Sequence, residues 1–261
     1  MNRIERKFKE LKIKNKKAFI VFITCGYPDL DTTRKLISEF VRQGVDIIEL
    51  GVPFSDPLAD GPVIQESSQA ALKRKTDINA ILNLVKIARK NKIDIPIALM
   101  SYYNPIFCYG RERFIKKAKA SGVDGVIIPD MPPEEDRTFI KLAGKFNIDT
   151  IFFLSPTSLS SRIKLIAGVS KGFIYYVSLT GVTGPRKKLS PGLVDNLRRI
   201  KKITAKPVCV GFGVSNRRQI KEIYKIADGV IVGSVVIQKI KENINRSDLV
   251  KRVGACIKKL H

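Results

Sequence analysis

The sequence predicts an α/β fold: a single (βα)8 TIM barrel with an extra N-terminal helix, formed by residues 1–261 as one domain. Short runs rich in β-branched residues alternate with helical patterns along the whole chain, as in βα units. Most of these runs are apolar throughout, which is typical of a parallel sheet covered on both faces. The first run leads into CGYPDLD, which lacks the G-x-G-x-x-G motif of an open dinucleotide-binding sheet. A closed barrel is therefore favoured.

The elements follow in order. Ile4, Phe8 and Leu11 have helical spacing and predict a short amphipathic helix before the first strand. Eight strands are expected at Ala18–Thr24, Asp46–Leu50, Ile95–Met100, Gly125–Ile128, Thr150–Leu154, Phe173–Val177, Pro207–Val210 and Gly229–Val232. Helices are expected between and after them at Asp31–Gln43, Gln65–Arg74, Ile78–Asn91, Arg111–Ser121, Glu134–Phe146, Ser160–Val169, Pro191–Lys202, Asn216–Ile226, Val235–Asn243 and Leu249–Leu260. Asp31, Ser160 and Asn216 offer side-chain oxygens that could cap helix N-termini.

Composition excludes several classes of protein. No apolar run is long enough to span a bilayer, and the charged N-terminus lacks the apolar region of a signal peptide. We therefore expect a cytoplasmic protein with no membrane partner. The single histidine, His261, cannot build a Ser-His-Asp triad or a histidine metal site, and the four cysteines are too widely spaced for a zinc site. Acid–base chemistry must then use Asp, Glu, Lys, Tyr or Cys, with no metal.

The formal net charge is +24, from 48 basic and 24 acidic residues. Such a charge could serve a polyanionic partner, or it could reflect lysines on solvated helix faces. The basic residues are spread over nearly every predicted helix, and no platform of interleaved aromatic residues accompanies them. We therefore expect no nucleic-acid partner, although the charge could help to attract a phosphorylated substrate.

Two carboxylates stand at or after the end of the second predicted strand. Glu49 lies among Ile47, Ile48 and Leu50, where burial would raise its pKa toward the range of a general acid and base. It could instead be an inward-facing Glu that pairs with a lysine. Asp60 lies in the following Pro- and Asp-rich loop; it could act with Glu49 on a common ligand or could simply form a turn before Gly61.

Glycine-bearing turns follow the last two predicted strands, in GFGVSN and GVIVGS. Barrels commonly bind phosphate at these positions, through backbone N–H groups and a helix N-terminus. The groups expected to do so belong to Gly211, Gly213, Gly233 and Ser234, although the glycines could serve only tight turns. The segment MSYYNPIFCYG after the third strand is expected to be an aromatic loop, either a ligand wall or rim packing. The segment SLTGVTGPRKK after the sixth resembles a lid.

These residues indicate an enzyme that acts on a phosphorylated small molecule without histidine or metal, but they do not name its reaction. The run ELGVPFSDPLADGP, residues 49–62, closely resembles the signature of the tryptophan synthase alpha-subunit family. The resemblance continues through FITCGYPD, YYNPIFCYG, IIPDMPPEE, FIYYVSLTGVTG, GFGVSN and DGVIVGS, in the family's order, and covers about residues 1–258.

The resemblance implies roles for individual residues. Glu49 corresponds to the catalytic glutamate and Asp60 to the catalytic aspartate. Residues implied to bind the phosphate are Gly184, Gly213, Gly233 and Ser234. Those implied to line the indole pocket are Phe22, Met100, Ile127, Phe153, Tyr175 and Phe212, with Tyr102 nearby and Thr183 on the lid. Contacts with a partner subunit are implied for Pro53, Asp56, Asn104 and Phe107.

The family resemblance implies retro-aldol cleavage of indole-3-glycerol phosphate to indole and glyceraldehyde 3-phosphate, with no cofactor. Indole would pass to a beta subunit in an alpha2beta2 heterotetramer that makes tryptophan. Three alternatives stay open at this stage. They are a stand-alone lyase that releases free indole, another phosphate-binding barrel such as a phosphosugar isomerase, and a non-enzymatic protein that binds nucleic acid or only activates a partner.

Overall fold

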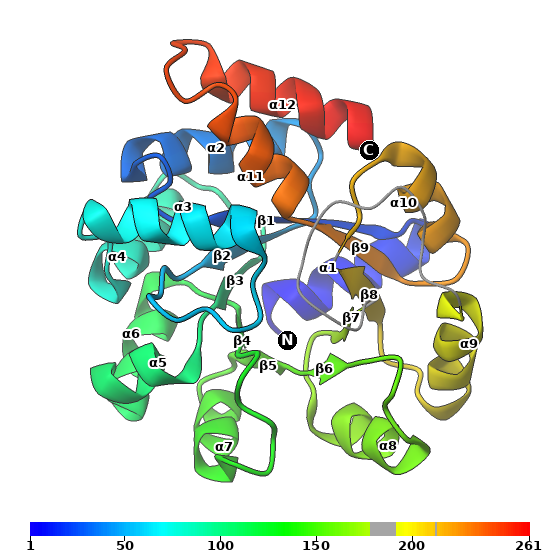
Figure 1. Cartoon of the computed structure of the whole chain (residues 1–261). Helices are drawn as coiled ribbons and strands as arrows, with labels where there is room; N and C mark the ends of the chain where they lie inside the picture. The colour runs from blue at the N-terminus through cyan, green and yellow to red at the C-terminus, as the bar shows by residue number, and fades with distance from the viewer. Residues whose placement is uncertain (178–191, 212) are drawn as a thin grey trace.

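The computed structural model describes residues 1–177, 192–211 and 213–261, and its parallel strands form a ring surrounded by helices (Figure 1). Strands are hydrogen-bonded in the order β5-β4-β3-β2-β1-β9-β8-β7-β6. Their bounds are β1 Ala18–Thr24, β2 Ile47–Gly51, β3 Ile97–Met100, β4 Gly125–Ile127, β5 Asp149–Ile151, β6 Phe153–Leu154, β7 Ile174–Val177, β8 Val208–Gly211 and β9 Gly229–Val232. All the pairings are parallel, so the predicted barrel is confirmed.

The fifth predicted strand forms as two consecutive pieces. β5 pairs with β4, while β6 pairs with β7, and the buried Phe152 lies between the two pieces. The carbonyl of Phe152 accepts a hydrogen bond from the Tyr175 N–H at 3.0 Å, so the ladder to β7 begins at this residue. The ring of strands therefore passes through this segment, and nine assigned strands correspond to the eight that the sequence predicts.

Helices cover the outside of the ring (Figure 1). Their bounds are α1 Arg3–Ile13, α2 Leu30–Arg42, α3 Pro62–Lys73, α4 Ile78–Lys90, α5 Tyr103–Tyr109, α6 Arg111–Ser121, α7 Arg137–Lys145, α8 Ser160–Val169, α9 Leu193–Ile203, α10 Arg217–Tyr224, α11 Ser234–Lys241 and α12 Leu249–Leu260. The amphipathic helices turn their apolar sides inward; α2, for example, buries Leu36, Ile37 and Phe40, and α12 packs on α2 and α11. No helix in the described parts of the chain combines the length and the apolar character that a membrane span requires.

The structure corrects the expected aromatic loop after the third strand, because Tyr103–Tyr109 form the helix α5. Pro105 lies in its first turn, where the missing N–H has no intrahelical acceptor to lose, so proline is tolerated. Helix α3 begins at Pro62, three residues before the predicted start, because a proline is well suited to the first helical position.

Two predicted helix caps are wrong. Asp29, not Asp31, caps α2 by accepting from the Thr32 N–H at 2.7 Å, and Leu159 precedes α8 without a side-chain cap. The predicted cap at Asn216 is confirmed, since its side chain accepts from the Gln219 N–H at 3.0 Å. Several polar residues lie near each helix start. Which of them caps the helix depends on the direction in which the backbone enters the first turn.

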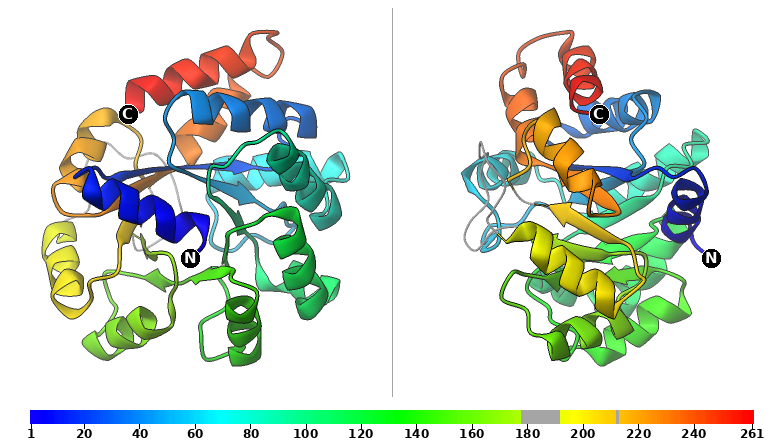
Figure 2. Two further views of the ribbon diagram at one scale, coloured as in Figure 1. Left: turned by 180° about the vertical axis from the view of Figure 1, so that it is seen from behind. Right: turned by 90° about the vertical axis from the view of Figure 1, so that its right-hand side faces the viewer.

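The N-terminal helix α1 crosses the end of the barrel at which the strands begin, as the view from behind shows (Figure 2). Ile4 is fully buried, and its Cδ1 atom lies so near Gly125 that a Cβ there would stand 2.8 Å away. The Phe8 ring lies 5.8 Å from that of Phe173. Because α1 covers this end, the opposite end, where the strands finish, is the one that can hold a site.

Candidate active site

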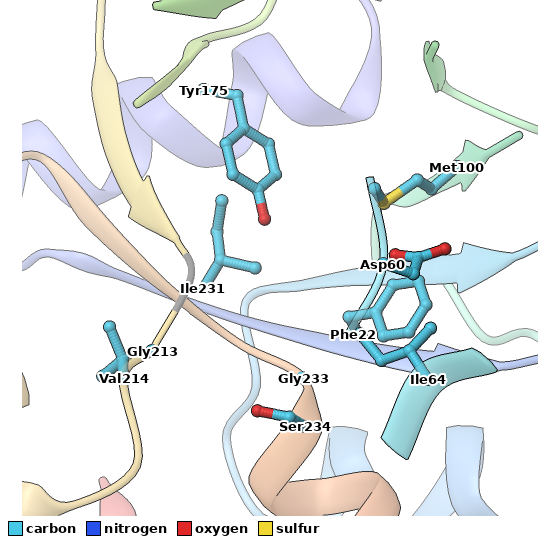
Figure 3. Close-up of a pocket in the computed structure, with 10 residues that line it drawn as sticks. All are labelled: Phe22, Asp60, Ile64, Met100, Tyr175, Gly213, Val214, Ile231, Gly233 and Ser234. Atoms are coloured by element: carbon cyan, nitrogen blue, oxygen red, sulfur yellow. The ribbon is translucent and has the colours of Figure 1, made fainter. Parts of the chain in front are cut away.

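A pocket opens at the carboxyl ends of the strands, with an unfilled space of about 430 Å³ that includes its mouth. Ten of the described residues line it, and Figure 3 shows them converging on the pocket: Phe22, Asp60, Ile64, Met100, Tyr175, Gly213, Val214, Ile231, Gly233 and Ser234. A second cavity shares four of these residues and extends toward Thr24, Gly51, Val52, Ser68 and Tyr102. The pocket thus joins the predicted carboxylate loop to the predicted phosphate turns.

Glu49 lies in the middle of β2, in register with Phe22 of β1 and Ala98 of β3. Because side chains alternate between the two faces of a sheet, Glu49 shares with Phe22 the face that looks into the barrel. Its side chain is fully buried, and within the described residues neither carboxylate oxygen has a hydrogen-bond partner. Burial raises the pKa of Glu49 to about 8. The lysine pairing considered for Glu49 is not seen among these residues, and the carboxyl group is available to move a proton.

Asp60 lies just before α3, in the loop that follows β2, and is 7% exposed. Its Oδ2 atom accepts a hydrogen bond from the Tyr102 hydroxyl at 3.1 Å, and its carbonyl accepts from Gln65 Nε2 at 2.8 Å. Burial raises the pKa of Asp60 to about 6, while the bond from Tyr102 acts in the opposite direction. Near neutral pH, Asp60 is therefore mostly ionised while Glu49 is mostly protonated.

Tyr175 faces both carboxyl groups from β7 on the other side of the barrel. Burial raises its pKa well above the usual value, and negative charge on Glu49 and on Asp60 raises it further. A Cβ on Gly211 would stand 2.4 Å from the Tyr175 hydroxyl, so the end of β8 must be glycine for this ring to fit. The tyrosine therefore remains neutral and forms part of the pocket wall opposite the acids.

The apolar residues predicted to line an indole pocket fall into two groups. Phe22, Met100 and Tyr175 line the main pocket, and Tyr102 lines its extension. Ile127 is buried in β4, in register with Met100, and Phe153 packs on the Tyr175 ring at 4.7 Å between centroids. These last two lie beside lining residues on the same face of the sheet, but they are not among the described residues that line either cavity.

Gly213, Gly233 and Ser234 lie together at the mouth opposite Asp60 (Figure 3). Ser234 is the first residue of α11 and Gly233 its N-cap, so backbone N–H groups and the positive end of the helix dipole are available at the pocket. Gly213 has a φ of 77°, a conformation that favours glycine. The predicted residues Thr183, Gly184 and Phe212 lie outside the described residues.

Sequence reasoning missed three of the described residues that line the main pocket: Ile64, Val214 and Ile231. Ile231 could have been found, because it is two residues before Gly233 and alternation in a strand places both on one face. Ile64 is in the first turn of α3 and was missed because that helix was predicted to begin at Gln65. Nothing in the local sequence distinguishes Val214 from its neighbours.

The residues predicted to contact a partner differ in exposure. Asp56 and Asn104 are exposed, and Phe107 on α5 is 57% exposed, which is unusual for an aromatic side chain. Pro53 is buried in the chain itself. Within residues 1–177, 192–211 and 213–261, no group of three His, Cys, Asp or Glu side chains is arranged to hold a metal ion.

The family model of the tryptophan synthase alpha chain matches residues 8–260. The chain belongs to the tryptophan synthase alpha chain family. The alpha chain of Geotalea uraniireducens (strain Rf4) is 47% identical over 257 residues, which cover 98% of this chain and 96% of that relative. The alpha chain of Caldanaerobacter subterraneus subsp. tengcongensis is 46% identical over 253 residues, covering 97% and 96%.

Solved structures agree with this assignment. The alpha subunit from Legionella pneumophila str. Paris is 35% identical and superposes with a TM-score of 0.93, covering 100% of this chain and 97% of that one. A chain of tryptophan synthase from Mycobacterium tuberculosis is 33% identical with a TM-score of 0.90, covering 99% and 96%. The predicted family is confirmed, and with it the class of enzyme, the lyase that cleaves indole-3-glycerol phosphate and works with a beta subunit.

Proposed function

We propose that this pocket cleaves indole-3-glycerol phosphate with Glu49 and Asp60 as its catalytic residues. One observation carries the proposal. Asp60, mostly ionised near neutral pH, lines one side of the pocket, and glycine turns at a helix N-terminus line the other. Glu49, mostly protonated, lies in register with the lining residue Phe22, on the face of β2 that looks into the barrel. A substrate requires this arrangement if it has a ring that becomes positively charged at one end and a phosphate at the other.

The chemistry follows from the two protonation states. A C3 carbanion of indole is a poor leaving group, so C3 is protonated first, by Glu49, which holds its proton at neutral pH. The ring nitrogen then becomes positive, and the nearby Asp60 carboxylate stabilises that charge. Glu49, now ionised, takes the proton from the hydroxyl next to the ring. The C–C bond breaks, its electrons return to the indole ring, and the new carbonyl leaves as glyceraldehyde 3-phosphate.

Phosphate binding at Gly213, Gly233 and Ser234 supplies orientation. Backbone N–H groups at the start of α11 can hold a dianion without a charged side chain. Anchoring the far end of the substrate holds the ring between Phe22 and Tyr175, beside Asp60 and on the barrel-facing side that Glu49 shares with Phe22. The high positive charge of the chain, +24, would help to collect an anionic substrate.

We further propose that indole passes to a beta subunit in a cytoplasmic alpha2beta2 complex. The exposed Asp56, Asn104 and Phe107 lie on or next to the two elements that hold Asp60 and Tyr102. A partner that covers them would contact the same loop that carries one catalytic carboxylate. We therefore expect the partner to accelerate cleavage as well as to consume indole.

The test is indole release from indole-3-glycerol phosphate, with and without the cognate beta subunit. The variants are Glu49→Gln, Asp60→Asn and, as a control, Glu222→Gln on the exposed face of α10. Both active-site variants should lose roughly 10²-fold or more in kcat, and the control should not change. No indole from folded protein under any condition would refute the proposed cleavage. Indole release that the beta subunit neither accelerates nor consumes would favour a stand-alone lyase.

A further inference from the structure

Ser68 ties the loop that carries Asp60 to the helix that follows it. The Ser68 hydroxyl accepts a hydrogen bond from the Phe54 N–H at 2.9 Å and is placed to donate to the Phe54 carbonyl at 3.2 Å. Ser68 lies on α3 and is 4% exposed. One buried hydroxyl thus satisfies both backbone groups of a loop residue for which the described part of the chain offers no backbone partner.

The Phe54 side chain connects the Ser68 hydrogen bonds to Asp60 through its contact with Tyr102. It lies 5.4 Å from the Tyr102 ring, between centroids. The Tyr102 hydroxyl accepts from the Ala59 N–H at 2.8 Å and donates to Asp60 Oδ2 at 3.1 Å. The loop is therefore held at Phe54 and again at Ala59 and Asp60, while Leu58 between these points is 84% exposed.

We propose that Ser68 is a positioning residue for the cleavage reaction, acting on Asp60 through Phe54 and Tyr102. The inference rests on the proposed catalytic role of Asp60. Without the hydroxyl, the Phe54 N–H and carbonyl lose their partner, and the Phe54 ring is free to leave the Tyr102 ring. The hydrogen bond to Asp60 then loses its fixed geometry, although both proposed catalytic carboxyl groups are still present.

The experiment compares Ser68→Ala with Ser68→Thr, which keeps the hydroxyl, and with Ser67→Ala. Ser67 is the neighbouring buried serine, and its hydroxyl donates to the Ile64 carbonyl and bonds to Thr24; among the described residues it makes no hydrogen bond to the loop. Ser68→Ala should lower kcat for indole formation roughly 10-fold, because small misplacements of a catalytic group are costly. The KM should stay within about twofold, since the phosphate turns are untouched.

The pH profile separates positioning from stability. In Ser68→Ala the acid limb of kcat should move to higher pH, because Asp60 loses a hydrogen bond that favours its ionised form. Ser68→Thr should keep the acid limb of the kcat–pH profile at the wild-type position. Ser67→Ala should lower the melting temperature without shifting that limb. If Ser68→Ala does not fold, Phe54→Leu, which removes the ring contact alone, should give the same displacement.

Three results would contradict the proposal in different ways. If Asp60→Asn is inactive but Ser68→Ala and Phe54→Leu keep the wild-type kcat and acid limb, the positioning role is refuted and the proposed function stands. If Asp60→Asn keeps full activity, the proposed function itself fails, and the role of Ser68 fails with it. A Ser68→Ala variant that loses only melting temperature would assign the hydroxyl to stability alone.

Discussion

The Tyr102 hydroxyl donates to Oδ2 of Asp60 across 3.1 Å, joining the segment after β3 to the loop after β2. The same hydroxyl accepts from the Ala59 N–H at 2.8 Å, so its proton is directed toward the carboxylate. This bond favours the ionised form of Asp60, and burial opposes it. The balance between the two leaves the pKa of Asp60 at about 6, within reach of physiological pH.

Replacing Tyr102 with Phe should therefore raise the pKa of Asp60 above about 6. If Asp60 works as a carboxylate, activity falls as pH falls through that pKa, and the acid limb of kcat/KM should move to higher pH. The measurement is the pH–rate profile of indole release. Tyr103→Phe is the matched control, because the neighbouring hydroxyl donates to Asp136 and not to Asp60. An unmoved limb in Tyr102→Phe would show that the bond does not set the protonation of Asp60.

The buried Glu49 should make the protein less stable at high pH. Its pKa in the folded chain is about 8, above its usual value of 4.5, so the folded state binds this proton more tightly than the unfolded chain. The stabilisation is complete below the unfolded pKa and is lost as pH rises through about 8. Glu49→Gln keeps the shape without the charge, so it should gain stability over wild type as pH rises. Urea unfolding at pH 6 and pH 9 tests this; an equal difference at both values would contradict it.

Asp149 offers the same test at the opposite end of the barrel, away from the pocket. It is 2% exposed, its Oδ2 atom has no hydrogen-bond partner among the described residues, and burial raises its pKa to about 7. Stability contributed by the proton is present at low pH and is lost as pH rises through about 7. Asp149→Asn should therefore raise the melting temperature at pH 8 more than at pH 5. Cleavage activity should not change, which distinguishes this residue from Glu49.

Gly51 must remain glycine for the pocket wall to keep its shape. A Cβ on this residue would stand 2.6 Å from Cζ of Phe22, so Gly51→Ala should push the ring into the pocket. We expect a loss of roughly 1–3 kcal/mol in the free energy of unfolding from overpacking, together with a raised KM. Gly168→Ala on α8 is the control, because nothing lies within 4 Å of the added atom and alanine favours a helix. A wild-type KM in Gly51→Ala would show that Phe22 can move away without narrowing the site.

Several features could be predicted because their signals are local. An apolar run interrupted by one acid identifies Glu49, and glycine turns after the last two strands identify Gly213 and Gly233. The contact between Tyr102 and Asp60 could not be predicted in this way, because it joins residues 42 positions apart. The helix α5 resembles a loop in sequence, because its proline and aromatic residues are common in turns, but in the structure it forms a helix that packs beside α6.

The sequence by itself determined the order of the elements, the parallel sheet, the family and the two candidate acids, because these depend on residue type and spacing along the chain. Only the tertiary structure decided which acid is neutral and which is ionised. Glu49 and Asp60 differ in protonation because one is fully buried without a described partner while the other accepts a bond from Tyr102. A pKa depends on solvent exclusion and on the nearest dipoles, and both are set by neighbours that the fold brings together from distant parts of the chain.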